Sequence, residues 1–364
     1  LHASTQEKGV LVGATRREED SDTVFTMLDN PADLARASAT LFSMLDDPAD
    51  LARASAVSRS WRQFVIANQL SKLQCLRAFP ELSAFTHVDV TTTSGYSSSS
   101  LDQPHREHRV YTHLAQGLLS EYKPRDCIIH CIGASTTDSF PEESIQNTIE
   151  PVDPVEVRPS YWSSRSNGDP DAPECLIYRL QADLCLVDEI KMQPFKAFFQ
   201  LGDPIYSAKS IQFQMGYPRS PLRPEALVSD ENEGQLIDDR NYVWTYTSPQ
   251  FPMLQENVLQ SFKLPCPVLC IGGVVKVELL GRAQKQELDG LYYVCVSHVQ
   301  ILGKPLSREL GVVPRGNGLV LNYYLDPRTC GIPRCESSGD DAAADGIAWR
   351  RTSGILEWRE GVEG

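Results

Sequence analysis

The sequence predicts an α+β protein with more than one domain, in which a small all-helical unit is followed by an antiparallel β-sandwich. Residues 24–79 are rich in Ala, Leu and Arg, and their only prolines, Pro31 and Pro48, follow Asn or Asp as at helix starts. Residues 127–306 instead contain short apolar stretches separated by turn residues, without long helical segments between them. A chain of 364 residues is long enough for both units and for extensions around them.

The helical unit contains one short phrase twice, as MLDNPADLARASA at 27–39 and as MLDDPADLARASA at 44–56. In the second copy Asp47 can cap a helix, Pro48 suits the first helical position, and Asp50 lies in the first turn, where negative charge is favourable. Only the second copy continues into VSRSWRQF. The first copy is therefore interpreted as a partial duplication rather than as a second module.

The segment LFSMLDDPADLARASAVSRSWRQFV at 41–65 resembles the F-box, a short three-helix unit that docks on the Skp-family adaptor of cullin-based ubiquitin ligases. The resemblance implies that the adaptor contacts lie at Leu45, Pro48, Leu51, Ala54, Val57 and Trp61. The family pattern begins with a Leu-Pro segment before its first helix. Here that segment is absent, and the first copy of the phrase stands in its place.

Six stretches of the second region predict strands: LIYRL (176–180), DEIKMQPF (188–195), SIQFQMG (210–216), YVWTYT (242–247), VVKVELLG (274–281) and YVCVSHVQI (293–301). In VVKVELL, the polar residues Lys276 and Glu278 alternate with aliphatic residues, which indicates a strand with one solvent-facing side. Strands at this spacing favour an antiparallel sandwich.

The segments that flank the two units predict little regular structure. Residues 1–23 are polar and are expected to be disordered, and residues 307–364 are expected to form an irregular, disordered tail. Residues 80–126 are expected to be a linker that contains a Ser-rich loop and one helix, at about 105–122.

The stretches IGASTTDSFPEESIQNTIEP (132–151) and RPSYWSSRSNG (158–168) resemble the galactose-binding or discoidin sandwich, a jelly-roll fold, and in particular its version in the Doc subunit of the anaphase-promoting complex. The resemblance implies a substrate-recognition loop at Tyr161, Trp162, Ser163 and Arg165. In such folds the tryptophan of this segment often packs inward and anchors the loop, so a structural role for Trp162 stays open beside the ligand-binding one. Together with the helical unit, residues from about 40 to 306 resemble a group of plant F-box proteins.

Charge and cysteine content limit the possible partners. The formal net charge is -14 and the isoelectric point is near 5.0, which argues against nucleic acid and anionic membranes as partners. No apolar run is long enough to span a bilayer, and the first residues lack the layout of a secretion signal. The ten cysteines are scattered, and several lie in apolar runs, which is typical of reduced thiols in a cytoplasmic or nuclear protein.

No motif predicts a catalytic site, a cofactor or a metal. His105, His108 and His113 share a predicted helix without a third ligand fixed by spacing, so a solvated helix is favoured over a metal site. CIIHC (127–131) and CPVLC (266–270) have spacings that zinc could use, but their apolar residues favour buried strands with core thiols.

Two further arrangements contain residue types that catalysis uses, but neither predicts a catalytic site. Glu142 and Glu143 are adjacent, and the sequence pairs no second carboxylate with them. Cys295 and His298 are three apart in a predicted strand, which places them on opposite faces.

These expectations describe a non-catalytic adaptor of a cullin-based, SCF-type ubiquitin ligase, without a cofactor. The helical unit would bind the Skp-family subunit and the cullin scaffold, and the sandwich would bind an unknown protein or glycoprotein substrate. One alternative is a stand-alone carbohydrate- or protein-binding sandwich with a non-functional F-box. Another is a hydrolase, which would need a carboxylate pair or a metal cluster at the rim of the sandwich.

Overall fold

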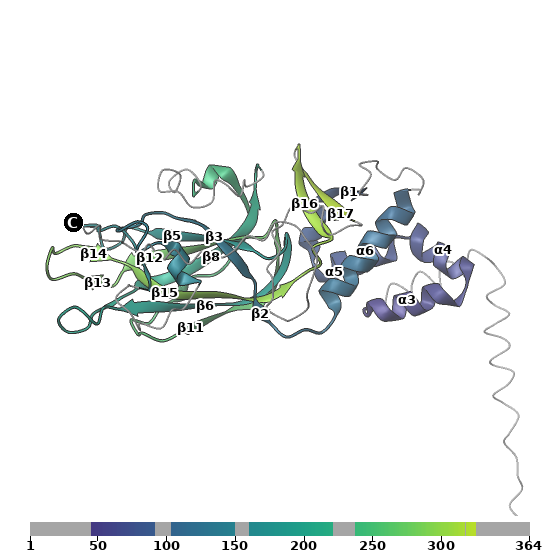
Figure 1. The fold of residues 1–364 in the computed structure, drawn as a ribbon. Coiled ribbons are helices and arrows are strands. Elements are labelled where there is room, and N and C mark those ends of the chain that lie inside the picture. The colour runs from purple at the N-terminus through teal and green to yellow at the C-terminus, as the bar shows by residue number, and fades with distance from the viewer. Residues whose placement is uncertain (1–44, 92–102, 150–159, 221–236, 317, 325–364) are drawn as a thin grey trace, which may run out of the picture. The chain divides into compact units, whose positions relative to one another are not determined.

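The computed structural model describes residues 45–91, 103–149, 160–220, 237–316 and 318–324 (Figure 1). The described part of the chain begins with helices α3 (Pro48–Val57), α4 (Arg59–Ala67) and α5 (Leu70–Ala78), followed by the 3-10 turn η1 (Pro80–Ala84), strand β1 (Phe85–Thr91) and helix α6 (Gln103–Leu119). The first copy of the repeated phrase, 27–39, lies outside the described residues.

Side-chain caps determine where α3 and α4 begin. The Asp47 carboxylate accepts a hydrogen bond from the Ala49 backbone N–H at 2.8 Å, and Pro48 occupies the first turn of α3, as the sequence predicts. Ser58 ends α3 and caps α4, because its Oγ accepts a hydrogen bond from the Trp61 backbone N–H at 3.1 Å. One residue thus makes the corner between the two helices, and Val57 and Trp61 lie on either side of it.

Two antiparallel sheets form the sandwich. The first has the strand order β10-β8-β12-β5-β3, with β9 paired to β8. The second has the order β11-β6-β15-β2, with β4 paired to β15 and β7 paired to β6. The strands are β2 (Arg125–Asp126), β3 (Ile128–Ala134), β4 (Trp162–Ser163), β5 (Glu174–Leu180), β6 (Leu184–Lys196), β7 (Ile205–Tyr206), β8 (Ala208–Pro218), β9 (Tyr242–Thr247), β10 (Phe251–Pro252), β11 (Gln260–Ile271), β12 (Val274–Arg282), the hairpin β13 (Gln284–Lys285) and β14 (Tyr292–Tyr293), and β15 (Cys295–Pro305), with the short turns η2 (Ile145–Thr148) and η4 (Asp239–Asn241).

The six predicted strands correspond to β5, β6, β8, β9, β12 and β15, so a helical unit followed by an antiparallel sandwich is confirmed. One detail of β12 is wrong. Val275 and Val277 point into the core between the sheets as expected, but Lys276 on the opposite face is buried rather than solvated. Its ammonium lies 2.9 Å from carboxylate oxygens of both Asp239 and Glu278, because η4 brings Asp239 over that face.

A third sheet, of order β1-β17-β16, corrects the expected linker and tail. Strands β16 (Leu310–Arg315) and β17 (Gly318–Tyr324) form an antiparallel pair within the region predicted to be irregular. Strand β17 then pairs in parallel with β1, from the region predicted to be a linker. The prediction is wrong at these residues because the partner of β1 lies more than two hundred residues away in the sequence, where local patterns carry no information about it.

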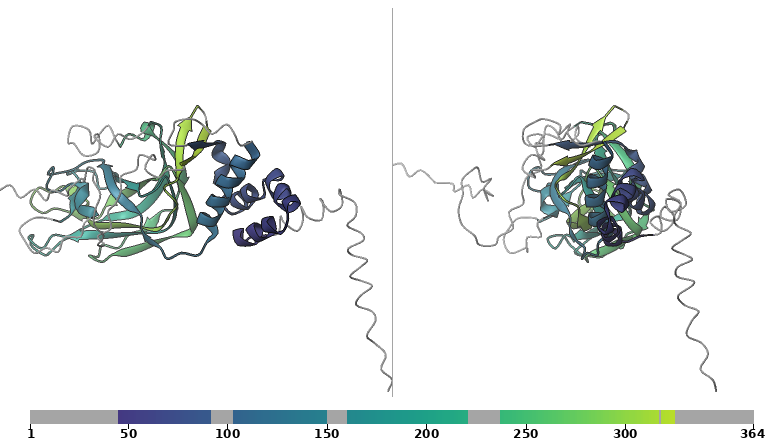
Figure 2. Two further views of the ribbon diagram at one scale, coloured as in Figure 1. Left: turned by 45° about the vertical axis from the view of Figure 1, so that its right-hand side comes forward. Right: turned by 90° about the vertical axis from the view of Figure 1, so that its right-hand side faces the viewer.

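Helix α6, expected to be solvated, is also buried along one side. Its residues Val110, Tyr111, Leu114 and Leu118 belong to a cluster that includes residues of β1 and β17 and the ends of β6 and β11. Figures 1 and 2 show β1, β16 and β17 beside α5 and α6. This cluster connects the helices, the three-stranded sheet and one end of the sandwich into one continuous core.

Candidate functional site

The residues predicted to bind the adaptor divide into two groups. Leu51 and Ala54 are buried, at 3% and 9% exposure, and pack against Val65 of α4. The side of α3 that carries them faces its own bundle, and their role as partner contacts stays a prediction. Val57 and Trp61 are exposed, at 65% and 38%.

Leu45 and Pro48 complete the predicted set, and both are half-buried. Leu45 packs against the same small core as Leu51, and its backbone carbonyl accepts hydrogen bonds from Gln74 at 2.8 Å and from Arg77 at 3.0 Å. These bonds attach the start of the F-box-like segment to α5. Helix α5 thus fixes the segment that leads into α3, the helix that ends at the exposed apolar corner.

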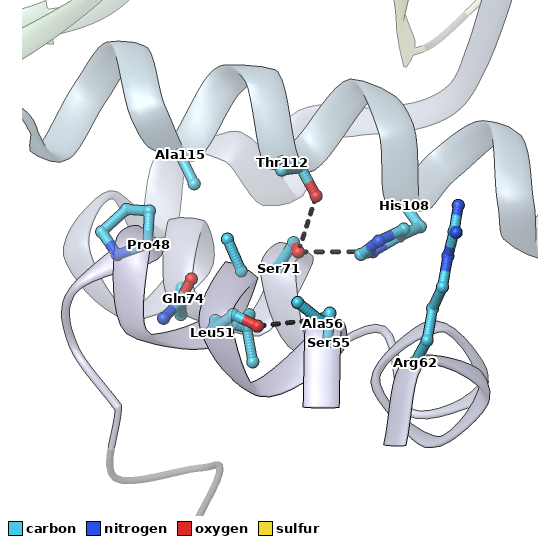
Figure 3. Close-up of a pocket in the computed structure, with 11 residues that line it drawn as sticks. Pro48, Leu51, Ser55, Ala56, Arg62, Ser71, Gln74, His108, Thr112 and Ala115 are labelled. Atoms are coloured by element: carbon cyan, nitrogen blue, oxygen red, sulfur yellow. Dashed lines mark hydrogen bonds between the residues drawn. The ribbon is translucent and has the colours of Figure 1, made fainter. Parts of the chain in front are cut away.

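A cavity of about 280 Å³ lies among helices α3, α4, α5 and α6 (Figure 3). Ser71, Thr112 and His108 point toward one another there, with Ser71 Oγ 3.0 Å from Thr112 Oγ1 and 3.4 Å from His108 Nδ1. Arg62 of α4 extends toward His108 at the edge of the cavity. Gln74 is buried beside it, and its Oε1 has no hydrogen-bond partner among the described residues.

The histidines of α6 do not form a metal site. Burial lowers the pKa of His108, and the charges of Arg62 and His105 lower it further. His113 instead lies with Nε2 3.5 Å from a carboxylate oxygen of Glu309. Across the described ranges, no group of three or more His, Cys, Asp or Glu side chains could hold a metal ion.

A second cavity of about 140 Å³ lies at the edge of the sandwich and is called the rim pocket below. Its residues come from the loop after β3, the segment entering β4, the end of β6 with the loop that follows, the short strand β7, and the hairpin that leads into β15. They are Asp138, Glu143, Tyr161, Ser163, Phe195, Ala197, Phe199, Gln200, Tyr206, Gln286, Tyr293 and Cys295.

The predicted recognition loop contributes to this pocket unequally. Trp162 is completely buried, and its Nε1 donates to the Thr136 carbonyl at 3.0 Å, so it anchors the loop and does not face a ligand. Arg165 is exposed but does not line the pocket, and its Nε donates to the Thr137 carbonyl at 3.1 Å. Tyr161 and Ser163 do line it.

Aromatic rings and carboxylates meet in the rim pocket. Tyr161 stacks on Phe195 with ring centroids 3.7 Å apart, and its hydroxyl donates to Glu143 Oε1 at 2.7 Å. Burial raises the pKa of Glu143; the Tyr161 hydrogen bond opposes that shift, and Asp138 adds to it. Burial also raises the pKa of Asp138. Glu143, for which the sequence identified no carboxylate partner, thus shares a pocket with Asp138.

A buried ion pair joins the segments that lead into the rim pocket. Arg282 of β12 lies 2.5 Å from a carboxylate oxygen of Glu174, and both side chains are almost fully buried. The same guanidinium donates to Ser164 Oγ, to the Arg165 carbonyl and to the Tyr292 carbonyl at 3.1, 2.8 and 3.0 Å. Arg282 therefore holds together the two segments that carry Tyr161 and Tyr293 into the pocket.

The cysteines do not form a reactive centre in the described part of the chain. Burial raises the pKa of Cys295 to about 12, so this thiol is not ionised near neutral pH. His298 Nδ1 lies 2.9 Å from the Thr148 carbonyl. Cys131 and Cys270 are buried in strands and Cys127 is buried between β2 and β3, whereas Cys266 is exposed, contrary to the expectation of a core thiol. No helix among the described residues is long and apolar enough to cross a membrane.

The sequence did not identify most residues of the rim pocket. Phe195 and Phe199 lie at the end of β6 and just after it, Tyr206 and Tyr293 lie on other segments, and only folding brings all four to one cavity. A local signal was available for one of them. In FKAFFQLGDP, two adjacent phenylalanines precede turn residues, and Phe198 and Phe199 are indeed exposed, at 58% and 70%.

Comparison with known proteins agrees with this arrangement. The F-box-like family model matches residues 41–77. The F-box protein At4g00755 of Arabidopsis thaliana is 44% identical over 327 residues, which cover 85% of this chain and 82% of that protein.

Solved structures are similar to the sandwich only distantly. The family 32 carbohydrate-binding module of Streptococcus pneumoniae EndoD is 9% identical and aligns with a TM-score of 0.32 over 50% of this chain and all of that module. Allantoicase from Saccharomyces cerevisiae is 15% identical, with a TM-score of 0.31 over 52% of this chain and 50% of the enzyme. Similarities at this level indicate neither a shared ligand nor a shared activity. The identity to the Arabidopsis protein along most of both chains, together with the F-box-like match at residues 41–77, shows that this chain belongs to the F-box proteins.

Proposed function

We propose that this protein is a substrate-recruiting adaptor of a cullin-based ubiquitin ligase. In this function the F-box-like unit binds a Skp-type subunit, and the sandwich binds the protein to be modified. The adaptor supplies no catalytic group, because holding the substrate near a charged conjugating enzyme raises its effective concentration there. The function requires a location in the cytoplasm or the nucleus, where such ligases act.

The observation that carries the proposal is the exposed apolar corner within the matched segment. Val57 and Trp61 lie on either side of the Ser58 cap, and their exposed fractions are 65% and 38%. Leu51 and Ala54, on the same helix as Val57, are buried in the core of the unit. Exposed large apolar residues next to each other are typical of protein interfaces, and tryptophan is among the residues that contribute most to binding. We propose that the Skp-type subunit covers this corner.

Co-purification with a Skp-type subunit tests the proposal. Val57→Asp and Trp61→Ala should each reduce retention of the subunit about tenfold or more, in line with loss of a central interface residue. Leu73→Asp is the matched control, because Leu73 is 47% exposed in the same unit but belongs to α5 rather than to the corner between α3 and α4. Thermal unfolding of each variant separates loss of binding from loss of folding.

Two outcomes would reject the proposal in its present form. Wild-type protein that retains no Skp-type subunit would leave the stand-alone binding sandwich as the better explanation. Equal losses in Val57→Asp and Leu73→Asp would move the interface away from the proposed corner.

A hydrolase remains the second candidate, because the rim pocket does contain the pair of carboxylates that such an enzyme needs. Its volume of about 140 Å³ argues against this, since sites that enclose a substrate usually span about 300–1,000 Å³. We expect no release of 4-nitrophenol from 4-nitrophenyl glycosides above the rate without protein. Turnover that disappears in Asp138→Asn would establish the hydrolase instead.

A further inference from the structure

We infer that the rim pocket binds a single cationic side chain, lysine or arginine, presented by the substrate protein. This inference rests on the proposed function, in which the sandwich receives the substrate. The size of the pocket, its hydrogen-bonding groups and its aromatic walls all favour such a ligand.

The size of the pocket selects one side-chain head rather than a larger ligand. A cavity of about 140 Å³ lies below the range of about 300–1,000 Å³ for sites that enclose a drug-sized ligand. That space fits the end of one long side chain inserted from a neighbouring protein. It is small for a disaccharide or a nucleotide, which need larger sites.

The hydroxyl and thiol groups that line the pocket already donate within the protein. The Tyr161 hydroxyl donates to Glu143 and the Tyr293 hydroxyl donates to Asp289, at 2.7 and 2.6 Å. The remaining hydroxyl and thiol groups do the same: Tyr206 to Gln200, Ser163 to the Ser164 carbonyl, and Cys295 to Ser163. Beside them, the side chains of Gln200 and Gln286 add amide groups to the lining. A ligand that supplies its own donors therefore suits the pocket better than one that only accepts.

The acceptors, in contrast, remain available. Asp138 and Glu143 form no ion pair with any Lys, Arg or His within the described segments. The charge of Arg165 acts on Asp138, but its Nε donates to the Thr137 carbonyl and no ion pair joins the two side chains. Two carboxylates that share a partly buried site repel each other, and an inserted cation relieves this repulsion. Lys and Arg carry only donors and a positive charge, which matches what the pocket lacks.

The aromatic walls add to this selectivity. Phe195 stacks on Tyr161 and lies 6.3 Å from Phe199 between ring centroids, and Tyr206 and Tyr293 meet edge to face at 6.2 Å. Such rings bind the apolar stem of a long side chain, and their faces attract its positive head. A neutral sugar would also stack on them, but it carries no positive charge to meet the carboxylates of Asp138 and Glu143.

Binding of N-acetyl-L-lysine methylamide to the full chain, followed by NMR, tests the inference. We expect a dissociation constant in the millimolar range, at least about tenfold weaker binding of the isosteric neutral N-acetyl-L-norleucine methylamide, and no competition by galactose. Equal binding of the norleucine compound, or displacement by galactose, would overturn the inference.

Two matched pairs of variants locate the site. Asp138→Asn should weaken binding of the lysine compound about tenfold, whereas Glu287→Gln, an exposed acid outside the pocket, should leave it unchanged. Phe199→Ala should weaken it severalfold, whereas Phe198→Ala, its exposed neighbour, should not. Equal losses within either pair would overturn the inference. In the acid pair they would mean that the lysine compound binds through overall negative charge, and in the phenylalanine pair that it binds any exposed ring.

The same preparations are assayed for retention of the Skp-type subunit. Retention without lysine binding would reject the rim pocket and leave the adaptor function standing. Lysine binding without retention would support the chemistry of the pocket and reject the adaptor function.

Discussion

Arg282 of β12 and Glu174 of β5 form an ion pair at 2.5 Å in which neither side chain is more than 3% exposed. A charge buried at this depth needs its partner. The free-energy cost of removing an unpaired ion from water is much larger than the free energy it gains from the protein interior. The pair also fixes a loop, since the same guanidinium holds the Arg165 and Tyr292 carbonyls. It therefore connects the stability of the sandwich to the geometry of the rim pocket.

Replacing one partner of this pair should be strongly destabilising. We expect Arg282→Met to lower the free energy of unfolding by about 3–5 kcal/mol, because it leaves Glu174 buried and unpaired. The double variant with Glu174→Met should recover part of the loss. Denaturant unfolding measures both, with Arg240→Met, in an exposed pair with Asp238, as a control that should change little. A double variant no more stable than the single one would contradict this explanation.

Leu51 and Val57, which lie on the same helix, should separate folding from partner binding. Leu51→Ala removes a buried side chain from a small core and should lower the free energy of unfolding by about 2–5 kcal/mol. Val57→Ala changes an exposed residue and should alter it by less than about 0.5 kcal/mol while weakening retention of the Skp-type subunit. Thermal unfolding and co-purification of both variants test this. Normal stability of Leu51→Ala would show that α3 does not pack as described.

The sheet formed by β1, β16 and β17 should be integral to the fold. Leu321 of β17 is completely buried, and Leu321→Ala should lower the free energy of unfolding by about 2–5 kcal/mol. Val313→Ala on β16 is the control, because that side chain is 40% exposed. If the two substitutions cost the same amount, β17 would not be packed against the helices.

Binding of the lysine compound should weaken in acid. Burial raises the pKa values of Asp138 and Glu143, so both carboxylates become protonated at a higher pH than usual and lose their attraction for a cation. We expect affinity to fall from neutral pH toward about pH 4.3, the ordinary value for Glu. In the same interval, protonation of these two groups favours the folded state.

Tyr161→Phe should move this pH profile upward, because the Tyr161 hydroxyl donates to Glu143 and lowers its pKa. NMR titration of the carboxyl groups in wild-type and variant protein measures the shift directly. A pKa of Glu143 that falls, or does not change, in Tyr161→Phe would contradict the assigned hydrogen bond.

The cavity beside α6 should respond to acid in the opposite direction. Burial lowers the pKa of His108, with Arg62 and His105 adding to the effect, so the folded state favours the neutral ring. The resulting stability is present above about pH 6.5, the ordinary value for His, and is lost as the pH falls through the lowered value in the folded protein. Protection of α5 and α6 amides from hydrogen exchange, corrected for the intrinsic pH dependence of amide exchange, should be lower at about pH 5 than at neutral pH, and the loss should be smaller in His108→Gln. An equal loss of protection in the variant would assign the effect to other groups.

Features that depend on neighbours in the sequence were predictable, and features that depend on distant residues were not. The Asp47 cap, the first-turn position of Pro48 and the alternation within β12 are local features, and the structure contains each of them. The solvated face expected for Lys276 failed because Asp239, a residue from another segment, covers it. Similarly, Trp162 was identified as part of a loop, but whether it faces inward depended on the packing around it.

The amino-acid sequence alone determined the order of the two units, the positions of most strands and the F-box-like segment, because these depend on capping, on periodicity and on motifs a few residues long. The tertiary structure decided which side of α3 is exposed, that β1 pairs with β17, and that Asp138 and Tyr161 meet in one pocket. These outcomes join residues far apart in the chain. The physical reason is that burial and electrostatic pairing depend on neighbours in space, and only the folded chain brings those neighbours together.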